Sequence, residues 1–130
     1  MAHLLGPDFI ALQVRDLAQS QQFYTQAMGL TPAPHSPPGA IVFATTPIPF
    51  AIREPIIDLA ASTRLGWGVA LWLKCDDADA LCASLQQQGV TITQPVFDGP
   101  FGRTFSCVDP DGYPLTIHGT SHAVPEESEA

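Results

Sequence analysis

The sequence predicts an α+β fold built from two copies of a strand–helix–strands unit. Asp16 and Gly29 bracket a helical pattern that follows an apolar strand, and Asp76 and Gly89, also thirteen residues apart, bracket a second one. Near the end, an Asp-Pro-Asp-Gly turn at 109–112 joins two runs of alternating apolar residues, which predicts a closing hairpin. With 45 % apolar and 14 % charged residues in 130, the composition is that of one globular domain.

The first half is predicted to place three strands around one helix. Residues 9–14 alternate, so that Phe9, Ala11 and Gln13 share the face opposite the larger aliphatic side chains. Asp16 is then the expected helix N-cap and Gly29 the stop. The next loop contains four prolines, which exclude a helix or a central strand: Pro32, Pro34, Pro37 and Pro38. Short strands are expected at 40–45 and 48–53, with a turn at 46–47.

The second half is predicted to repeat this order after a linking segment at 54–66. A strand at 68–74 precedes a helix for which Asp76 and Asp77 are both N-cap candidates. The buried stripe of that helix has helical spacing and comprises Ala78, Leu81, Cys82 and Leu85. Strands are expected at 90–96, 103–108 and 113–118, with a turn at 98–100 and a disordered acidic tail at 120–130. The helices should cover one face of each sheet and leave the other faces to curve around a central cavity.

The closing hairpin and the stretch from Ile10 through Phe23 and Tyr24 to Gly29 and Leu30 together resemble the vicinal oxygen chelate superfamily. This group holds glyoxalase I, extradiol dioxygenases and bleomycin-resistance binding proteins. The resemblance covers about residues 8–119. It implies one domain, 1–119, made of two βαβββ repeats at about 8–54 and 66–119, with curved mixed sheets around a cavity.

The resemblance also implies a divalent metal in most enzymes of the superfamily, held by His and Glu ligands from both repeats. The positions where it places three of these ligands carry Phe9, Ala70 (or Val69) and Thr116, and Glu54 is the nearest candidate for the fourth. A phenyl ring or a methyl group has no lone pair for a metal, and a threonine hydroxyl is a poor neutral substitute. We therefore expect no metal and no other cofactor.

The preferred interpretation is a metal-independent binding protein similar to the bleomycin-resistance branch, which sequesters an aromatic or amphipathic ligand in an apolar cavity. The residues predicted to bind that ligand are Phe9, Gln13, Phe50, Trp72, Lys74, Arg103, Phe105, Thr116 and His118. Phe43, Trp67 and Phe101 are further candidates whose strand face the sequence leaves open. Each aromatic residue can equally be a core residue, and Lys74 and Arg103 can equally be solvated strand ends.

Two alternatives stay open. One is a glyoxalase- or dioxygenase-like lyase or isomerase whose metal site has moved to Glu54, His118 and His35. The other is a structural or regulatory module whose cavity is filled by its own side chains. No nucleophile–base triad and no Gly-rich phosphate loop can be assembled, so no catalytic residue is assigned.

Charge and cysteine content restrict the partners. A net charge of −8 with only five basic residues argues against nucleic acid, and is compatible either with a cationic ligand or simply with solubility. The sequence contains neither a long apolar run nor a secretion signal, so no membrane partner is expected. Three cysteines in such a chain predict reduced thiols and a cytoplasmic location. The resemblance implies a homodimer.

Overall fold

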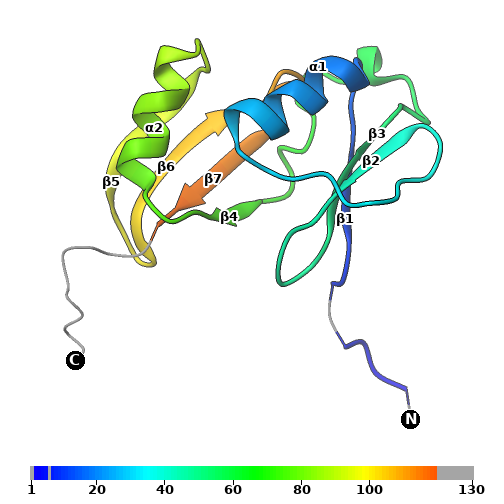
Figure 1. Cartoon of the computed structure of the whole chain (residues 1–130), viewed down its shortest axis with the longest axis horizontal. Helices are drawn as coiled ribbons and strands as arrows, with labels where there is room; N and C mark the ends of the chain where they lie inside the picture. Colours follow the sequence, from blue (N-terminus) through cyan, green and yellow to red (C-terminus); the bar gives the residue numbers. More distant parts are fainter. Residues whose placement is uncertain (1, 6, 120–130) are drawn as a thin grey trace. The chain divides into compact units, whose positions relative to one another are not determined.

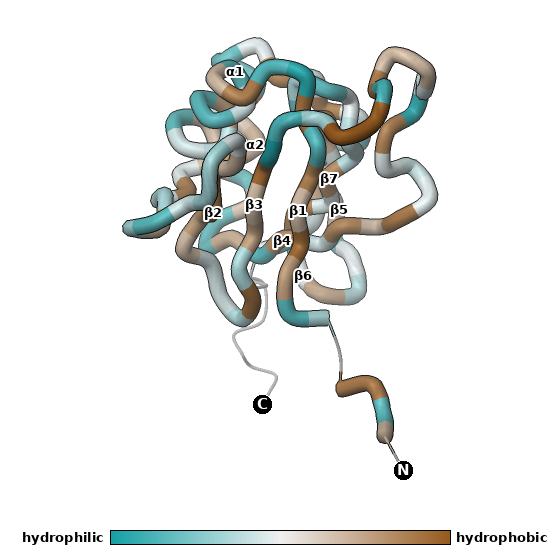
Figure 2. The backbone as a smooth tube through the Cα atoms, turned by 90° about the vertical axis from the view of Figure 1, so that its right-hand side faces the viewer, coloured by the Kyte–Doolittle hydropathy of each residue, from teal (hydrophilic) through white to brown (hydrophobic). Residues whose placement is uncertain are grey.

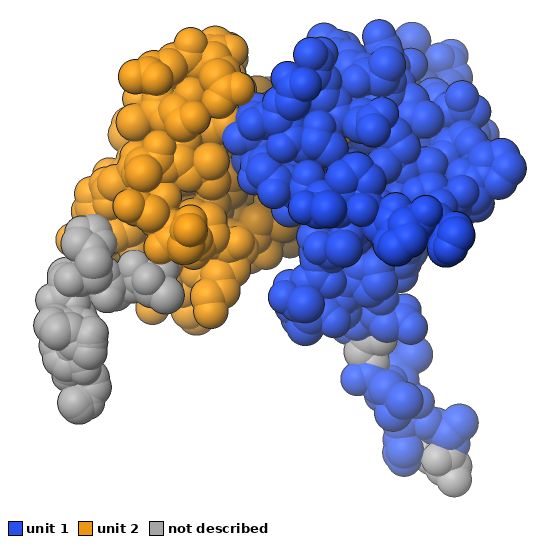
Figure 3. All heavy atoms as spheres, viewed as in Figure 1, with its two compact units in different colours: residues 1–63 blue, residues 64–130 orange. Residues whose placement is uncertain are grey.

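Both predicted helices form, and a mixed sheet accompanies each of them. The computed structural model describes residues 2–5 and 7–119. The chain divides into two units, residues 1–63 and 64–130 (Figure 3), and the boundary falls inside the segment predicted to link the halves. The acidic tail predicted at 120–130 lies outside the described residues.

The sheet of the first unit has three strands in the order β1-β3-β2: β1 is Ile10–Gln13, β2 is Ala40–Phe43 and β3 is Phe50–Arg53. β1 runs parallel to β3, and β2 runs antiparallel to it. A single bridge from Pro32 to Phe43 stands where a fourth strand would pair with β2. Because four prolines in residues 32–38 lack an N–H, this segment cannot form a longer ladder. The first repeat is therefore βαββ with a bridge, which corrects the predicted βαβββ.

The helix of the first unit starts at the predicted cap and ends in an unpredicted π-helical turn. The Asp16 carboxylate accepts a hydrogen bond from the Gln19 N–H at 3.1 Å, and α1 spans Leu17–Gln22. The chain continues as η1, Phe23–Ala27, in which the Met28 N–H bonds to the Phe23 carbonyl five residues earlier at 3.0 Å. The wider turn absorbs one extra residue before Gly29, whose φ of +81° suits a helix stop.

The helix of the second unit, α2, spans Ala78–Gln87, and of the two predicted caps it uses Asp77. The Asp77 carboxylate accepts from the Ala80 N–H at 3.0 Å. At the other end, the Val90 N–H bonds to the Leu85 carbonyl at 3.0 Å across Gly89, which has a φ of +82°. This is a Schellman stop, and a residue with a β-carbon would be strained at Gly89. The predicted stripe is largely buried, with Ala78, Cys82 and Leu85 in the core.

The sheet of the second unit has four strands in the order β4-β7-β6-β5. Their bounds are Trp72–Lys74 for β4, Ile92–Gly99 for β5, Gly102–Val108 for β6 and Pro114–His118 for β7. β4 is parallel to β7 and the other pairs are antiparallel. β5 lies at the sheet edge, where Pro95 and the register shifts near it are tolerated. In both units the first strand pairs with the last, and the remaining strands follow in reverse chain order, so the repeat and the α+β class are confirmed.

Two predicted boundaries in the second unit were wrong. The strand expected from Gly68 begins only at Trp72, because Gly66 has a φ of +73° and the Val69 N–H bonds back to its carbonyl at 3.1 Å, which makes a turn. The turn expected at 98–100 starts later, because β5 extends to Gly99.

Each unit has its own core on the helix-facing side of its sheet. In the first, the rings of Tyr24, Phe43 and Phe50 lie 5.2–6.0 Å apart at their centroids. In the second, α2 packs against β5 and β6 (Figure 1), over Phe105 and Ile117. The hydrophobic colouring of β1 and β3 in Figure 2 reflects the apolar residues that these strands carry. Among the described residues, no helix is long and apolar enough to cross a bilayer.

Candidate ligand-binding site

Strand register decides which predicted site residues share a face. In the first unit Phe50 pairs with Ile10 and Phe43, and its ring lies 5.2 Å from that of Tyr24. It is 7 % exposed and packs under the helix. In the second unit Phe105 is fully buried on the side that faces α2. Both residues therefore contribute to the cores, not to an accessible surface.

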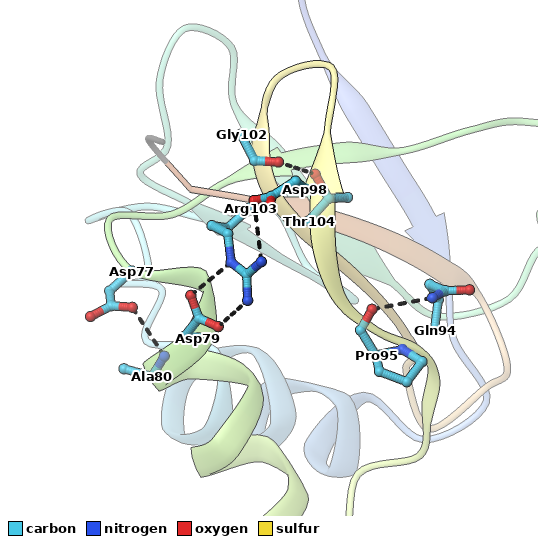
Figure 4. A network of polar contacts seen from close by, with 9 residues as sticks. All are labelled: Asp77, Asp79, Ala80, Gln94, Pro95, Asp98, Gly102, Arg103 and Thr104. Atoms are coloured by element: carbon cyan, nitrogen blue, oxygen red, sulfur yellow. Dashed lines mark hydrogen bonds and ion pairs between the residues drawn. The ribbon is translucent and has the colours of Figure 1, made fainter. Parts of the chain in front are cut away.

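Arg103 also lies on the helix-facing side, at the start of β6. Its guanidinium donates to both carboxylate oxygens of Asp79 on α2, at 2.9 and 3.2 Å, and to Asp98 on β5 at 3.2 Å (Figure 4). Hydrogen bonding to Asp79 and then to Asp98 raises the pKa of the guanidinium further above its ordinary value. Arg103 thus connects α2 to the hairpin, and its donors already have carboxylate partners.

Gln13 lies on the predicted face of β1, but its side chain has a local role. The amide oxygen accepts hydrogen bonds from the Ile56 N–H at 2.8 Å and the Ile57 N–H at 3.2 Å. These contacts fasten the segment after β3 to β1. Phe9 precedes β1 and is half exposed, so it is open to a ligand.

The remaining predicted residues of the second unit come together on the face of its sheet that points away from α2. Parallel pairing places Trp72 beside Thr116 and Lys74 beside His118. Antiparallel pairing continues these rows into β6, with Ser106 beside Thr116 and Thr104 beside His118. We call this side of the sheet the open face; it includes Trp72, Lys74, Thr104, Ser106, Thr116 and His118, with Phe101 from the β5–β6 turn. It brings together four of the nine predicted site residues.

An aromatic cluster occupies part of the open face. The Trp72 and Phe101 rings meet edge to face, with centroids 5.4 Å apart at 90°. The His118 ring lies 6.0 Å from each of them. Trp72 is 45 % and Phe101 63 % exposed, although both are large apolar groups. Rings this exposed on a sheet face offer a planar ligand a stacking surface at little cost in protein rearrangement.

The cysteines do not supply a nucleophile. Burial raises the pKa of the Cys107 thiol to about 12. The pKa values of Cys75 and Cys82 are also raised, chiefly by burial. A thiol with a raised pKa is protonated at neutral pH, and only the thiolate is an effective nucleophile or metal ligand.

The sequence matches a family model, the Glyoxalase/Bleomycin resistance protein/Dioxygenase superfamily, over residues 6–117. This chain belongs to that superfamily. A comparison with curated proteins gives no match. The match to the family model confirms the resemblance stated from the sequence.

Several solved structures share the fold of this chain. A glyoxalase/bleomycin resistance protein from Streptomyces sp. CB03234 is 23 % identical, with a TM-score of 0.68 over 87 % of this chain and 99 % of that one. TnmS3 from the same source, described as an antibiotic binding protein, is 24 % identical, with a TM-score of 0.67 over 92 % and 100 %. Protein ATC0852 from Agrobacterium tumefaciens is 26 % identical, with a TM-score of 0.68 over 91 % and 99 %.

The residues at the expected metal-ligand positions of this glyoxalase-superfamily chain do not fit a metal. Thr116 sits on β7 between Trp72 and Ser106, so its neighbours in the sheet add only an indole and a hydroxyl. Within residues 2–5 and 7–119, no three His, Cys, Asp or Glu side chains form a group able to hold an ion. These described residues thus supply no donor set through which a metal-dependent step could be derived.

The sequence analysis left out one aromatic residue on this side of the sheet and did not assign Phe101 to a side. Phe97 pairs with Thr104 and so shares the open face, but it lies where the sequence predicts the approach to a turn. Phe101 follows Pro100 in that turn, where alternation no longer indicates a side. Trp67, by contrast, donates its indole N–H to the Gly112 carbonyl at 3.1 Å and is not part of the cluster.

Proposed function

We propose that this member of the glyoxalase/bleomycin resistance superfamily binds and sequesters a small molecule with a planar aromatic group, without metal chemistry. The proposal rests on one observation, the exposed ring cluster of Trp72, Phe101 and His118 on a sheet face. An edge-to-face contact covers one face of one ring and leaves the other ring faces uncovered by that contact, and each stacked ring contributes about 0.5–1.5 kcal/mol beyond area burial. The description of TnmS3 as an antibiotic binding protein supports a binding role for this fold, although fold alone does not set function.

Fluorescence of Trp72 tests this proposal directly. The chain has two tryptophans, so Trp67→Phe leaves Trp72 as the only indole. Adding naphthamide and larger planar aromatics is expected to quench or shift that emission in a saturable way. Trp72→Phe is the matched control. It retains only the emission of Trp67, and that emission should not change when the compounds are added. If no planar compound changes the Trp72 signal, the binding proposal is wrong and the open face is only a surface of the fold.

Metal content separates binding from the enzyme alternative. Untagged protein purified without chelators is expected to carry less than about 0.1 equivalent of Mn, Fe, Ni or Zn per chain, because a metal site needs three or four converging donors. Elemental analysis by mass spectrometry measures this. A stoichiometric metal that disappears in both Glu54→Gln and His118→Gln would instead favour the relocated site of a lyase, isomerase or dioxygenase.

We also propose a homodimer in the cytoplasm. Ten large apolar side chains of the described residues are exposed, including Ile56, Ile57 and Val69, and a surface this apolar favours association. Among the described residues all three cysteines are free thiols, which suits a reducing compartment. Sedimentation equilibrium of the whole chain tests the dimer, since a monomer mass at micromolar concentration would contradict it.

A further inference from the structure

The ionisable groups on the open face are all basic. Its strand positions on β4, β7, β6 and β5 are Trp72, Lys74, Pro114, Thr116, His118, Thr104, Ser106, Val108, Gln94 and Phe97. Of these, only Lys74 and His118 can carry a charge, and none is a carboxylate. Asp98, the acidic residue of β5, pairs with Arg103 on the helix-facing side. The chain is acidic as a whole, yet the face around the rings has the opposite sign.

Lys74 lies close enough to the ring cluster to contact a ligand that stacks on Trp72. It follows Trp72 by two residues on β4, which puts both side chains on the same face about 6.5 Å apart along the strand. Its register partner is His118, about 4.8 Å away on the neighbouring strand. Lys74 is exposed, and within the described part of the chain no carboxylate pairs with its ammonium group. Asp76, the nearest acidic residue along the chain, lies beyond the end of β4.

We infer that the ligand is an aromatic anion, whose carboxylate or ionised phenol is held between Lys74 and His118 while its ring lies against Trp72 and Phe101. The inference rests on the proposed function and names its ligand class. An imidazole N–H can donate a hydrogen bond in either protonation state, and an ammonium group offers three donors. The hydroxyls of Ser106 and Thr116, one row away, add neutral donors for a ring oxygen. A cationic ligand, which the net charge alone left open, would meet Lys74 without a counter-charge.

Three probes with one ring system isolate the charge. Naphthoate, naphthamide and naphthylmethylammonium differ at one substituent, and their dissociation constants are measured on Trp67→Phe protein by fluorescence. The salt is set at about 0.15 M, where a screening length of about 8 Å suppresses distant charges. Naphthoate is expected to bind about three- to fivefold more tightly than naphthamide, because one partly exposed charge pair contributes a preference of that size. The ammonium probe is expected to bind more weakly than both.

The variants assign that preference to one side chain. Lys74→Gln is expected to remove the preference, so that naphthoate binds no more tightly than naphthamide. Arg64→Gln removes the same charge from an exposed residue whose guanidinium lies 5.1 Å from the Trp67 ring, outside the cluster, and should keep the preference. The inference is overturned if both variants lose the preference for naphthoate equally, or if the three probes bind the unmodified site with the same affinity. Either result leaves the proposal of aromatic binding intact. Failure of all three probes overturns the proposed function as well.

The single lysine gives an independent readout. Because Lys74 is the only lysine in the chain, reductive methylation with isotope-labelled formaldehyde yields one side-chain dimethylammonium signal apart from that of the N-terminal amine. That signal is expected to shift on adding naphthoate. If it instead shifts with protein concentration and ignores the probe, a second copy of the chain covers the open face, and the inference is wrong.

Discussion

Phe105→Ala is expected to lower the free energy of unfolding by about 3–5 kcal/mol, the cost typical of removing a buried ring from a core that cannot collapse around the cavity. Phe105 is fully buried in β6, next to Ile117 on the neighbouring strand and on the side that α2 covers. A loss of this size is a large fraction of the stability of a small domain. Urea titration followed by circular dichroism measures it.

Two further variants keep this result interpretable if Phe105→Ala is partly unfolded. Phe105→Leu retains most of the apolar volume and should cost about 1–2 kcal/mol, while the folded protein keeps its affinity for naphthamide. Phe101→Ala removes an equally large ring that is 63 % exposed, and should change stability by less than about 1 kcal/mol. A Phe105→Leu variant that is stable but no longer binds would return Phe105 to the ligand site.

The example of Phe105 shows which part of the site the sequence could supply. Alternation along one strand correctly grouped Trp72 with Lys74 and Thr116 with His118, because side chains two residues apart share a face whatever the partner strand is. Alternation does not show which of the two faces of a strand will be covered by the helix. Phe50 and Arg103 were therefore counted with the ligand site although register and the contacts of Asp79 place them under the helices.

Local signals predicted the helices better than the strand ends. Asp16 and Gly29 mark the ends of the first helix because capping and a positive φ are properties of a few neighbouring residues. The π-helical turn at Phe23–Ala27 is not visible in the sequence. It accommodates one residue more than a regular α-helical turn, and no local sequence pattern marks that extra residue. The bond from Gln13 to the backbone of Ile56 joins residues 43 apart, and no local pattern encodes such a pairing.

Trp72→Ala is expected to weaken naphthoate binding about tenfold, because it removes the ring that the ligand stacks on together with its edge-to-face contact to Phe101. Its effect on stability should stay below about 1 kcal/mol, since the side chain is already 45 % exposed. Isothermal titration calorimetry measures the affinity without relying on the fluorescence that the substitution removes.

Trp67→Ala is the matched control for this loss, because Trp67 is an indole of nearly equal exposure, 50 %, that is hydrogen-bonded to the Gly112 carbonyl away from the ring cluster. It should leave the dissociation constant of naphthoate within about twofold, whereas Trp72→Phe, which restores a ring, should recover most of the affinity. Equal losses in Trp67→Ala and Trp72→Ala would mean that naphthoate responds to general apolar surface. A Trp72→Phe variant as weak as Trp72→Ala would mean that the indole N–H, not the ring face, makes the contact.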